Sequence, residues 1–279
     1  MSKLHRPDDS SLPVLPFDIF EVIFKTLSME SLDLPTLKLC ALTQRSFCST
    51  CHRHVFSAIE LDVVKLDQLQ ALEELLRDNQ TIALYVNALD LHLVVYQYFP
   101  QDSGFFRPAF CQYLLRILVQ LPNIQSLVLF TPYTKDGVDW VGFGDELRTS
   151  LENIIQTPKL RLLDLRSTTL TNFPISSMLA RMPNLVDLRL GEFHGEAGID
   201  LISSEIVSHP VPELNCLYLP DCAHLHSVIA LLQVRSPIYS IIGIEHLSDL
   251  NLAIWSILGL DNAKGILSEL QNLEHLRLA

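Results

Sequence analysis

One apolar phrase, Leu-x-x-Leu-x-Leu, recurs along this chain and constrains its fold more than any other feature. Five clear copies begin at Ile124, Leu160, Leu185, Leu214 and Leu273. A proline stands two residues before the first apolar position in four of these copies. A weaker copy begins at Val86, and we place one more in the apolar run 238–244, where the register stays open. The chain therefore consists largely of one repeated structural unit.

The last part of each copy alternates apolar and polar residues, which is the pattern of a short β-strand with one buried face. Leu163 and Leu165 would lie on the buried face, and Asp164 on the opposite one. Segments with a helical pattern separate the strands, at 146–156, 175–181, 199–208 and 225–234. Residues 131–145 form a polar, glycine-containing insertion. A strand–turn–helix unit cannot bury its apolar face alone, so we expect the units to stack. The alternative is an ordinary α/β domain with leucine-rich strands.

Two copies extend beyond the strand, as Leu160-x-x-Leu163-x-Leu165-x-x-Thr168-x-Leu170 and Leu214-x-x-Leu217-x-Leu219-x-x-Cys222. They resemble the consensus of leucine-rich repeats. The resemblance implies an α/β fold in residues 58–279, an irregular leucine-rich-repeat solenoid with a curved parallel sheet and outer helices. Solenoids normally end in a polar cap, but this chain stops one residue after a repeat strand. We therefore favour a longer natural chain over a partner that covers this end.

Residues 12–57 form a separate block with three expected helices, behind a tail at 1–11 that we expect to be disordered. In the first helix, apolar residues recur at every fourth position, along one side: Leu15, Ile19, Ile23 and Leu27. Pro16 and Pro35 stand where helices begin. Three short helices can barely hold a core of their own, so the block is expected to dock on something.

This block resembles the F-box, in the form found in fungi. The matching residues are Leu15-Pro16, Ile19, Ile23, Pro35, Leu37, Leu42, Arg45 and Phe56. The sequence departs from the family at Thr43, where valine is usual, and at Phe47, where tryptophan is usual. The resemblance covers roughly the first fifth of the chain.

The F-box resemblance implies a substrate-receptor subunit of a Skp–cullin–F-box ubiquitin ligase, with no catalytic step of its own. The adaptor-facing residues would be Leu15, Pro16, Ile19, Ile23, Leu37 and Leu42. The partners would be a Skp-type adaptor, through it a cullin, and a protein target. The alternative is a leucine-rich-repeat interaction scaffold, in which a degenerate block only caps the solenoid.

The open face of the expected sheet is the candidate target-binding surface. In each strand, the residue between the two inward leucines points to this face. The resulting column reads Asp90, Val128, Asp164, Arg189, Tyr218 and Arg277. Tyrosine and arginine often dominate binding energies at protein interfaces. We therefore predict target contacts at Asp90, Asp164, Arg189, Tyr218 and Arg277.

Composition argues against several other classes. A net charge of −12 disfavours nucleic-acid binding, which needs a basic face. No stretch reaches the run of about 18 apolar residues that spans a membrane. The N-terminus lacks the pattern of a signal peptide, so we expect a cytoplasmic or nuclear protein. No nucleophile elbow or phosphate-binding loop occurs, so we expect no enzyme and no cofactor.

The segment Cys48-Ser49-Thr50-Cys51-His52 matches the spacing of a c-type haem attachment site. It falls inside the third expected helix of a chain without an export signal, which argues against haem. A zinc site would use Cys48, Cys51, His52 and His54. All four lie within two helical turns, whereas tetrahedral zinc needs well-separated ligand pairs. We expect the cysteines to be small, partly buried helix residues and no metal to bind.

Overall fold

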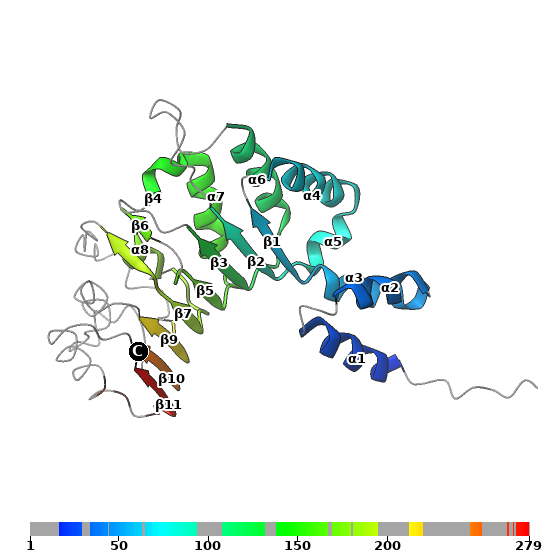
Figure 1. Ribbon diagram of the computed structural model, residues 1–279. Helices are drawn as coiled ribbons and strands as arrows, with labels where there is room; N and C mark the ends of the chain where they lie inside the picture. The colour runs from blue at the N-terminus through cyan, green and yellow to red at the C-terminus, as the bar shows by residue number, and fades with distance from the viewer. Residues whose placement is uncertain are drawn as a thin grey trace, which may run out of the picture. The chain divides into compact units, whose positions relative to one another are not determined.

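The structure is a computed structural model (Figure 1). It describes residues 17–29, 34–43, 45–62, 65–93, 108–131, 138–166, 169–179, 181–194, 212–219, 246–252, 267, 270 and 272–278. The chain divides into two compact units, Met1–Ser57 and Ala58–Ala279.

The N-terminal unit consists of three helices, α1 (Phe17–Met29), α2 (Leu34–Thr43) and α3 (Arg45–Val55), and each packs against the other two. Their small core holds the buried side chains of Phe24, Leu37 and Cys51. The Phe47 ring completes it, with its centroid 5.4 Å from that of Phe24 and 4.7 Å from that of Phe20. Aromatic side chains bury large areas, so three rings supply a core that so short a block could otherwise barely build.

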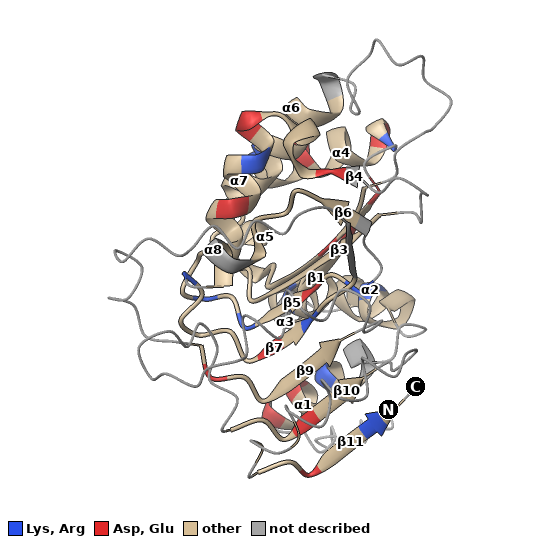
Figure 2. Ribbon diagram, turned by 90° about the vertical axis from the view of Figure 1, so that its left-hand side faces the viewer, with Lys and Arg blue, Asp and Glu red and all other residues tan. Residues whose placement is uncertain are grey.

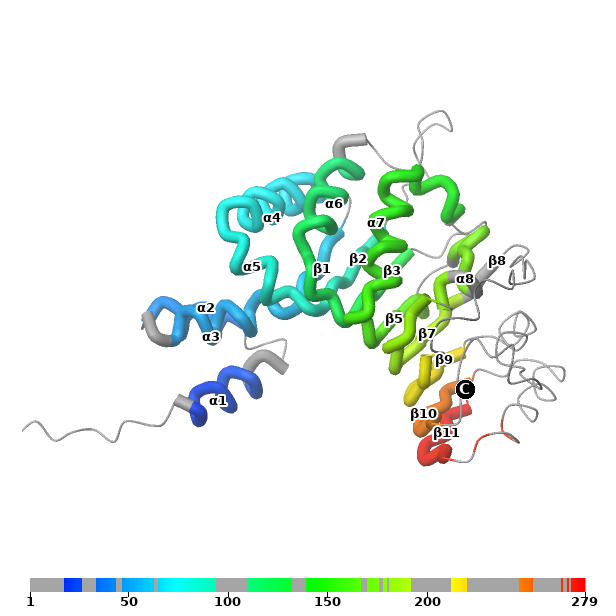
Figure 3. Tube along the Cα trace, turned by 180° about the vertical axis from the view of Figure 1, so that it is seen from behind, coloured from blue at the N-terminus to red at the C-terminus, as the bar shows by residue number. Residues whose placement is uncertain are grey.

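The C-terminal unit is built on an eight-stranded parallel sheet whose strands lie side by side in chain order (Figures 1 and 3). These strands are β1 (Ala58–Asp62), β2 (Ala88–His92), β3 (Ser126–Phe130), β5 (Leu162–Asp164), β7 (Asp187–Arg189), β9 (Cys216–Leu219), β10 (Asp249–Leu252) and β11 (His275–Leu278). The predicted α/β class and parallel sheet are confirmed. Each of these strands pairs only with the strands directly before and after it in this order, which is the arrangement that stacked units require.

The helices of this unit are α4 (Leu66–Asp78), α5 (Gln80–Tyr85), α6 (Pro108–Gln120), α7 (Asp145–Ile155) and α8 (Ile175–Leu179). α4 packs against α6, and α6 against α7, so these three helices form a row along one side of the sheet (Figure 1). The helices expected at 146–156 and 175–181 are present as α7 and α8. Those expected at 199–208 and 225–234 lie outside the described residues.

The leucines of the repeated phrase form continuous buried rows across the sheet. One row joins the residues that face each other in the strand register: Leu89, Leu127, Leu163, Leu188, Leu217 and Leu250. None of them is more than 1% exposed. On β11 the corresponding leucines, Leu276 and Leu278, are 42% and 60% exposed. The leucines of β11 are therefore much less buried than those of the strands that lie between two neighbours.

In three of the four copies with a proline, the residue after it ties its unit to the one before. The side-chain amide Nδ2 of Asn123 donates to the carbonyl oxygen of Leu84 at 2.9 Å, and that of Asn184 donates to Pro158 at 2.8 Å. In the copy with lysine, the Nζ atom of Lys159 donates to the carbonyl oxygen of Pro122 at 3.0 Å. The asparagine or lysine of these copies thus supplies a side-chain donor for a backbone carbonyl of the preceding unit.

From the sequence, we misplaced one unit of the sheet, that of β10, and missed another, that of β1. The unit expected in the run 238–244 falls outside the described residues, and the strand between β9 and β11 is instead β10, with Leu247 as its first buried leucine. β1 places Ile59 and Leu61 in register with Leu89 and Leu91, one unit earlier than the first copy that we recognised.

A second, three-stranded parallel sheet consists of β4 (Val138–Asp139), β6 (Thr169–Thr171) and β8 (Glu192–His194). β4 leads into the short 3₁₀ helix η1 (Trp140–Phe143). The Trp140 ring is buried against Phe143 and Phe173, at centroid distances of 5.2 and 4.7 Å. The insertion 131–145 is therefore more than a polar loop, because its aromatic residues fill part of the core.

Candidate protein-binding surfaces

The N-terminal unit exposes two apolar stripes. Five of the eleven exposed large apolar side chains in the described part of the chain lie on α1 and α2, namely Ile19, Val22, Ile23, Leu39 and Leu42. Their exposed fractions range from 42% to 83%. Their spacings of three and four residues place them along one face of each helix. The core of this unit uses other residues, so these five are free for a partner.

Most adaptor-facing predictions can be compared with this surface. Ile19, Ile23 and Leu42 are exposed, as an adaptor contact requires. Leu37 must be corrected, because its side chain is fully buried against Phe24 and Cys51 and belongs to the core. Leu15 and Pro16 lie outside the described residues.

Val22 and Leu39 belong to the exposed stripes but were not among the predicted residues. Val22 stands three residues after Ile19, and Leu39 three residues before Leu42. Helical periodicity alone could have identified both of them. The sequence comparison missed them because it considered only positions that match the family pattern.

The two departures from the F-box pattern have different structural consequences. Phe47 packs between the rings of Phe20 and Phe24 and so replaces tryptophan with another buried aromatic residue. Thr43 is exposed at the end of α2, where its Oγ1 hydroxyl donates to the carbonyl oxygen of Cys40 at 2.8 Å. Neither departure leaves a gap in the core.

The cysteine- and histidine-containing segment of α3 lies in this same unit. Burial, followed by the neighbouring Cys40 and Cys48, raises the pKa of the Cys51 thiol to about 11. The Cys48 Sγ atom lies 3.6 Å from Nε2 of His52. Across the described residues, no group of three or more His, Cys, Asp or Glu side chains is arranged to hold a metal ion. Cys51 thus serves as a small core residue.

The open face of the eight-stranded sheet carries one continuous row of residues in register. The row reads Glu60, Asp90, Val128, Asp164, Arg189, Tyr218, Asn251 and Arg277. All six residues of the predicted column belong to it. Glu60 and Asn251 were missed because their strands, β1 and β10, were not recognised in the sequence.

Asp164 is not available to a target, which corrects our prediction for this residue. Its side chain is buried, and Arg166 holds it through Nε at 3.0 Å and Nη2 at 2.7 Å, both to Oδ2. The backbone N–H of Arg166 also donates to Oδ1 at 3.0 Å. Nη1 of Arg189 approaches the same carboxylate at 3.5 Å. Asp164 therefore positions two arginines instead of meeting a partner.

Arg189 is held in place by a second carboxylate. Its Nε and Nη2 atoms donate to the two carboxylate oxygens of Asp187 at 3.0 and 2.6 Å. This hydrogen bonding is the largest of the effects that raise the pKa of Arg189 above its ordinary value. The guanidinium of Arg166 lies over the ring of Tyr218, 5.4 Å from its centroid. Arg166, just after β5, and Arg189 on β7 are thus fixed by bidentate contacts, and Arg166 also by stacking.

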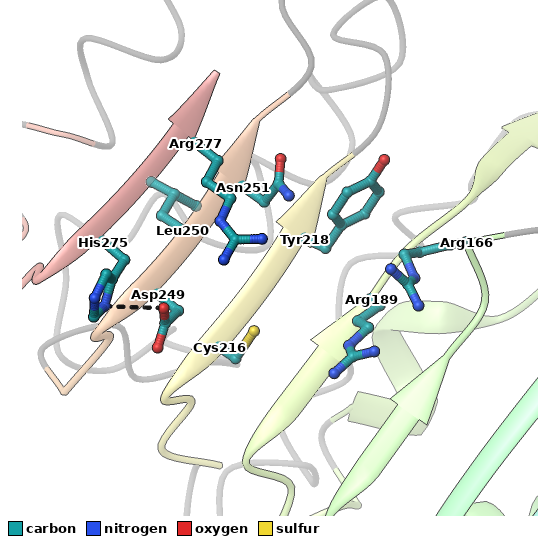
Figure 4. A pocket seen from close by; sticks show the side chains of 9 residues that line it. All are labelled: Arg166, Arg189, Cys216, Tyr218, Asp249, Leu250, Asn251, His275 and Arg277. Atoms are coloured by element: carbon teal, nitrogen blue, oxygen red, sulfur yellow. Dashed lines mark ion pairs between the residues drawn. The ribbon is translucent and has the colours of Figure 1, made fainter. Parts of the chain in front are cut away.

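A depression of about 230 Å³ opens on the sheet face beside these arginines (Figure 4). It is lined by Arg166, Arg189, Cys216, Tyr218, Asp249, Leu250, Asn251, His275 and Arg277. Three of the predicted target-binding residues, Arg189, Tyr218 and Arg277, meet here. Figure 2 shows the blue colour of Lys and Arg on β11.

The other end of the row is acidic. Glu60 and Asp90 face each other across β1 and β2, and no Lys or Arg of the described residues pairs with either. Burial, and then the charge of Glu60, raise the pKa of Asp90 above its ordinary value. Nε2 of His92 lies 3.4 Å from the Glu60 carboxylate, and its ring lies 5.0 Å from that of Phe130. The sheet face therefore changes in charge from one end to the other.

No protein-family model matches the sequence, and a comparison with curated proteins gives no significant match. In the described part of the chain, none of the helices combines the length and hydropathy needed to cross a bilayer.

Proposed function

We propose that this protein is the substrate-receptor subunit of a Skp–cullin–F-box ubiquitin ligase. The N-terminal unit docks on a Skp-type adaptor, and the sheet face of the C-terminal unit captures a protein target. The chain transfers no ubiquitin and acts by holding the target near the ligase. The observation that carries the proposal is the pair of apolar stripes on α1 and α2, beside a separate core.

The size of these stripes supports a dedicated partner. The exposed fractions of the five side chains add up to about three fully exposed side chains. Burying that much apolar surface contributes roughly 6 kcal/mol before the cost of association is subtracted. A micromolar complex needs about 8 kcal/mol, so the stripes would supply a large share of the affinity and polar contacts the rest.

The F-box-like residues agree with this assignment where they can be placed. Ile19, Ile23 and Leu42 match the family pattern and are exposed. Phe47 departs from the pattern yet keeps an aromatic ring in the core. These features support an N-terminal unit that folds around its own core and presents a surface to an adaptor.

Co-expression with a Skp adaptor, followed by co-purification, tests the proposal. The variant Ile19→Asp/Leu42→Asp places charges in both stripes and should abolish the complex while circular dichroism stays unchanged. Val119→Asp is the matched control, because Val119 is also an exposed apolar helix residue but lies on α6 of the other unit. This control should co-purify like wild type.

Two results would overturn the ligase proposal. One is a folded wild-type chain that forms no adaptor complex, which would favour an interaction scaffold. The other is an Ile19→Asp/Leu42→Asp variant that binds the adaptor as well as Val119→Asp does.

A further inference from the structure

We infer that the sheet face binds an extended target segment whose two ends carry opposite charges, with basic side chains over β1 and β2 and carboxylates over β9 to β11. The inference deepens the proposed function, on which it rests, by naming the class of target. It depends on the order of charges along the sheet.

At the acidic end, no lysine or arginine of the described residues neutralises the two facing carboxylates. Glu60 and Asp90 lie directly opposite each other in the register of β1 and β2. Like charges in this position destabilise a sheet. Asp62 on the same face already pairs with Lys65 at 3.4 Å, and His92 approaches Glu60 only from the side. A lysine or arginine of a target, placed between Glu60 and Asp90, would remove the repulsion.

Between the acidic end and the paired charges of β5 and β7, the face is apolar. β3 contributes Val128 and Phe130, and β5 contributes Leu162. All three are partly exposed, and the Phe130 ring packs beside that of His92. These side chains favour uncharged residues in the centre of a bound segment.

The basic end offers one guanidinium that is not already neutralised. Arg166 and Arg189 are paired with Asp164 and Asp187, but no ion pair reaches Arg277 from the described residues. Asp249, the acidic residue of β10, pairs with His275 at 3.2 Å.

Figure 4 shows Arg277 on the same side of the sheet as Asn251 and Tyr218, which occupy the same row on the two preceding strands. Their amide and hydroxyl groups can donate hydrogen bonds to the carboxylate that Arg277 attracts. This end therefore suits a glutamate or aspartate of the target.

The strand order gives the length of the segment. β11 lies six strands beyond β2, and parallel strands are about 4.8 Å apart, so the two ends are roughly 29 Å apart. An extended chain covers about 3.3 Å per residue. The basic and acidic ends of the target should therefore be separated by about nine residues.

Synthetic peptides with blocked termini provide the test, by fluorescence anisotropy with the full chain at low salt. The first peptide has two lysines, seven leucine or serine residues and two glutamates. The second has the same composition, with lysines and glutamates alternating at its centre. Exposed charge pairs are individually weak, but pairs with Glu60, Asp90 and Arg277 together should make the first peptide bind at least about fivefold more tightly. A reversed peptide is no control, because it can bind in the opposite direction.

A charge-reversed chain provides the complementary test. Glu60→Lys/Asp90→Lys should weaken binding of the first peptide and strengthen binding of a peptide with two glutamates at both ends. Glu74→Lys/Asp78→Lys changes the net charge equally on exposed positions of α4 and should behave as wild type.

Several outcomes would overturn the inference. Equal affinity for the two peptides of identical composition would do so, as would binding of neither peptide. The same change in peptide affinity in Glu60→Lys/Asp90→Lys and in Glu74→Lys/Asp78→Lys would also do so. Adaptor co-purification is measured in parallel. Lost peptide selectivity with intact adaptor binding refutes only the bipolar target, whereas lost adaptor binding with intact selectivity refutes only the ligase assignment.

Discussion

Asp164 and Asp90 lie in one row of the sheet face, yet their replacement by asparagine should change the stability of the protein in opposite directions. Asp164→Asn removes a buried negative charge from two arginines. Asp90→Asn removes a charge that faces Glu60, with no lysine or arginine of the described residues paired to either carboxylate. The pair of variants therefore tests whether the row divides into structural and partner-facing residues.

The expected loss for Asp164→Asn follows from its contacts. A hydrogen bond to a charged group contributes about 1.5–3 kcal/mol, and Asp164 accepts several. Arg166 and Arg189 are 43% and 30% exposed, so water can take over part of their pairing. We therefore expect a loss of about 2 kcal/mol, which lowers Tm by roughly 4–8 °C in a unit of this size.

The expected gain for Asp90→Asn is smaller and depends on pH. Relief of a cross-strand like-charge pair is worth a few tenths of a kcal/mol, up to about 1 kcal/mol. The pKa of Asp90 is raised in the folded state, so folding favours its protonated form. Wild type therefore loses stability as pH rises above the ordinary carboxyl pKa of 3.8 and through the raised value. The variant should gain at neutral pH and lose this advantage towards pH 4.

Thermal unfolding followed by circular dichroism at pH 7.5 and at lower pH measures both effects. Asp78→Asn on α4 serves as the control, because this exposed carboxylate should change stability by less than about 0.5 kcal/mol. The reasoning fails if Asp164→Asn and Asp90→Asn shift Tm in the same direction at pH 7.5. It also fails if Asp164→Asn matches the control.

Leu217→Ala opens a cavity in a fully buried row and should lower the free energy of unfolding by about 3 kcal/mol. Leu276→Ala, at the equivalent position of β11, should lower it by about 1 kcal/mol or less, as measured by urea titration. Equal losses would contradict the burial argument. Lys159→Met keeps the aliphatic stem but removes the bond to the preceding turn, and should cost about 1 kcal/mol in the same assay; an unchanged midpoint would mean that the bond stabilises nothing. Burial, followed by the charge of Asp187, raises the pKa of Cys216 to about 11. Its thiolate should therefore be scarce at pH 8, and iodoacetamide should label it far more slowly in the folded protein than in urea, which mass spectrometry can follow.

The sheet could be predicted because the spacing of the repeated leucines shows which strand residues are buried. Leucines at fixed spacing place a strand and its buried face, and the rows through Leu127, Leu163 and Leu188 follow from that spacing. The same logic failed at β10, where the phrase beginning at Leu247 is complete but lacks the preceding proline. We placed this unit in the dense apolar run before it instead, because hydrophobicity alone does not define the register of a strand.

The second sheet could not be predicted, because nothing in the sequence shows that β4, β6 and β8 pair with one another. Each has only two or three residues, which is too short for any periodicity to be recognised. The burial of Trp140 depends on Phe173, which stands more than thirty residues later. Contacts of this kind are set by stacking of successive units and not by local pattern.

Local sequence pattern also fails to distinguish Asp164 from Asp90. Strand alternation assigns both to the open face, and this is correct for their backbone positions. Their side chains differ because Arg166 follows Asp164 on the same face and Arg189 lies on the next strand, whereas Asp90 has Glu60 beside it. The neighbour across the strand decides whether a carboxylate is neutralised within the protein or left for a partner. Reading the face across the strands therefore singles out Glu60, Asp90 and Arg277, because among the described residues no lysine or arginine pairs with the two carboxylates and no carboxylate pairs with Arg277.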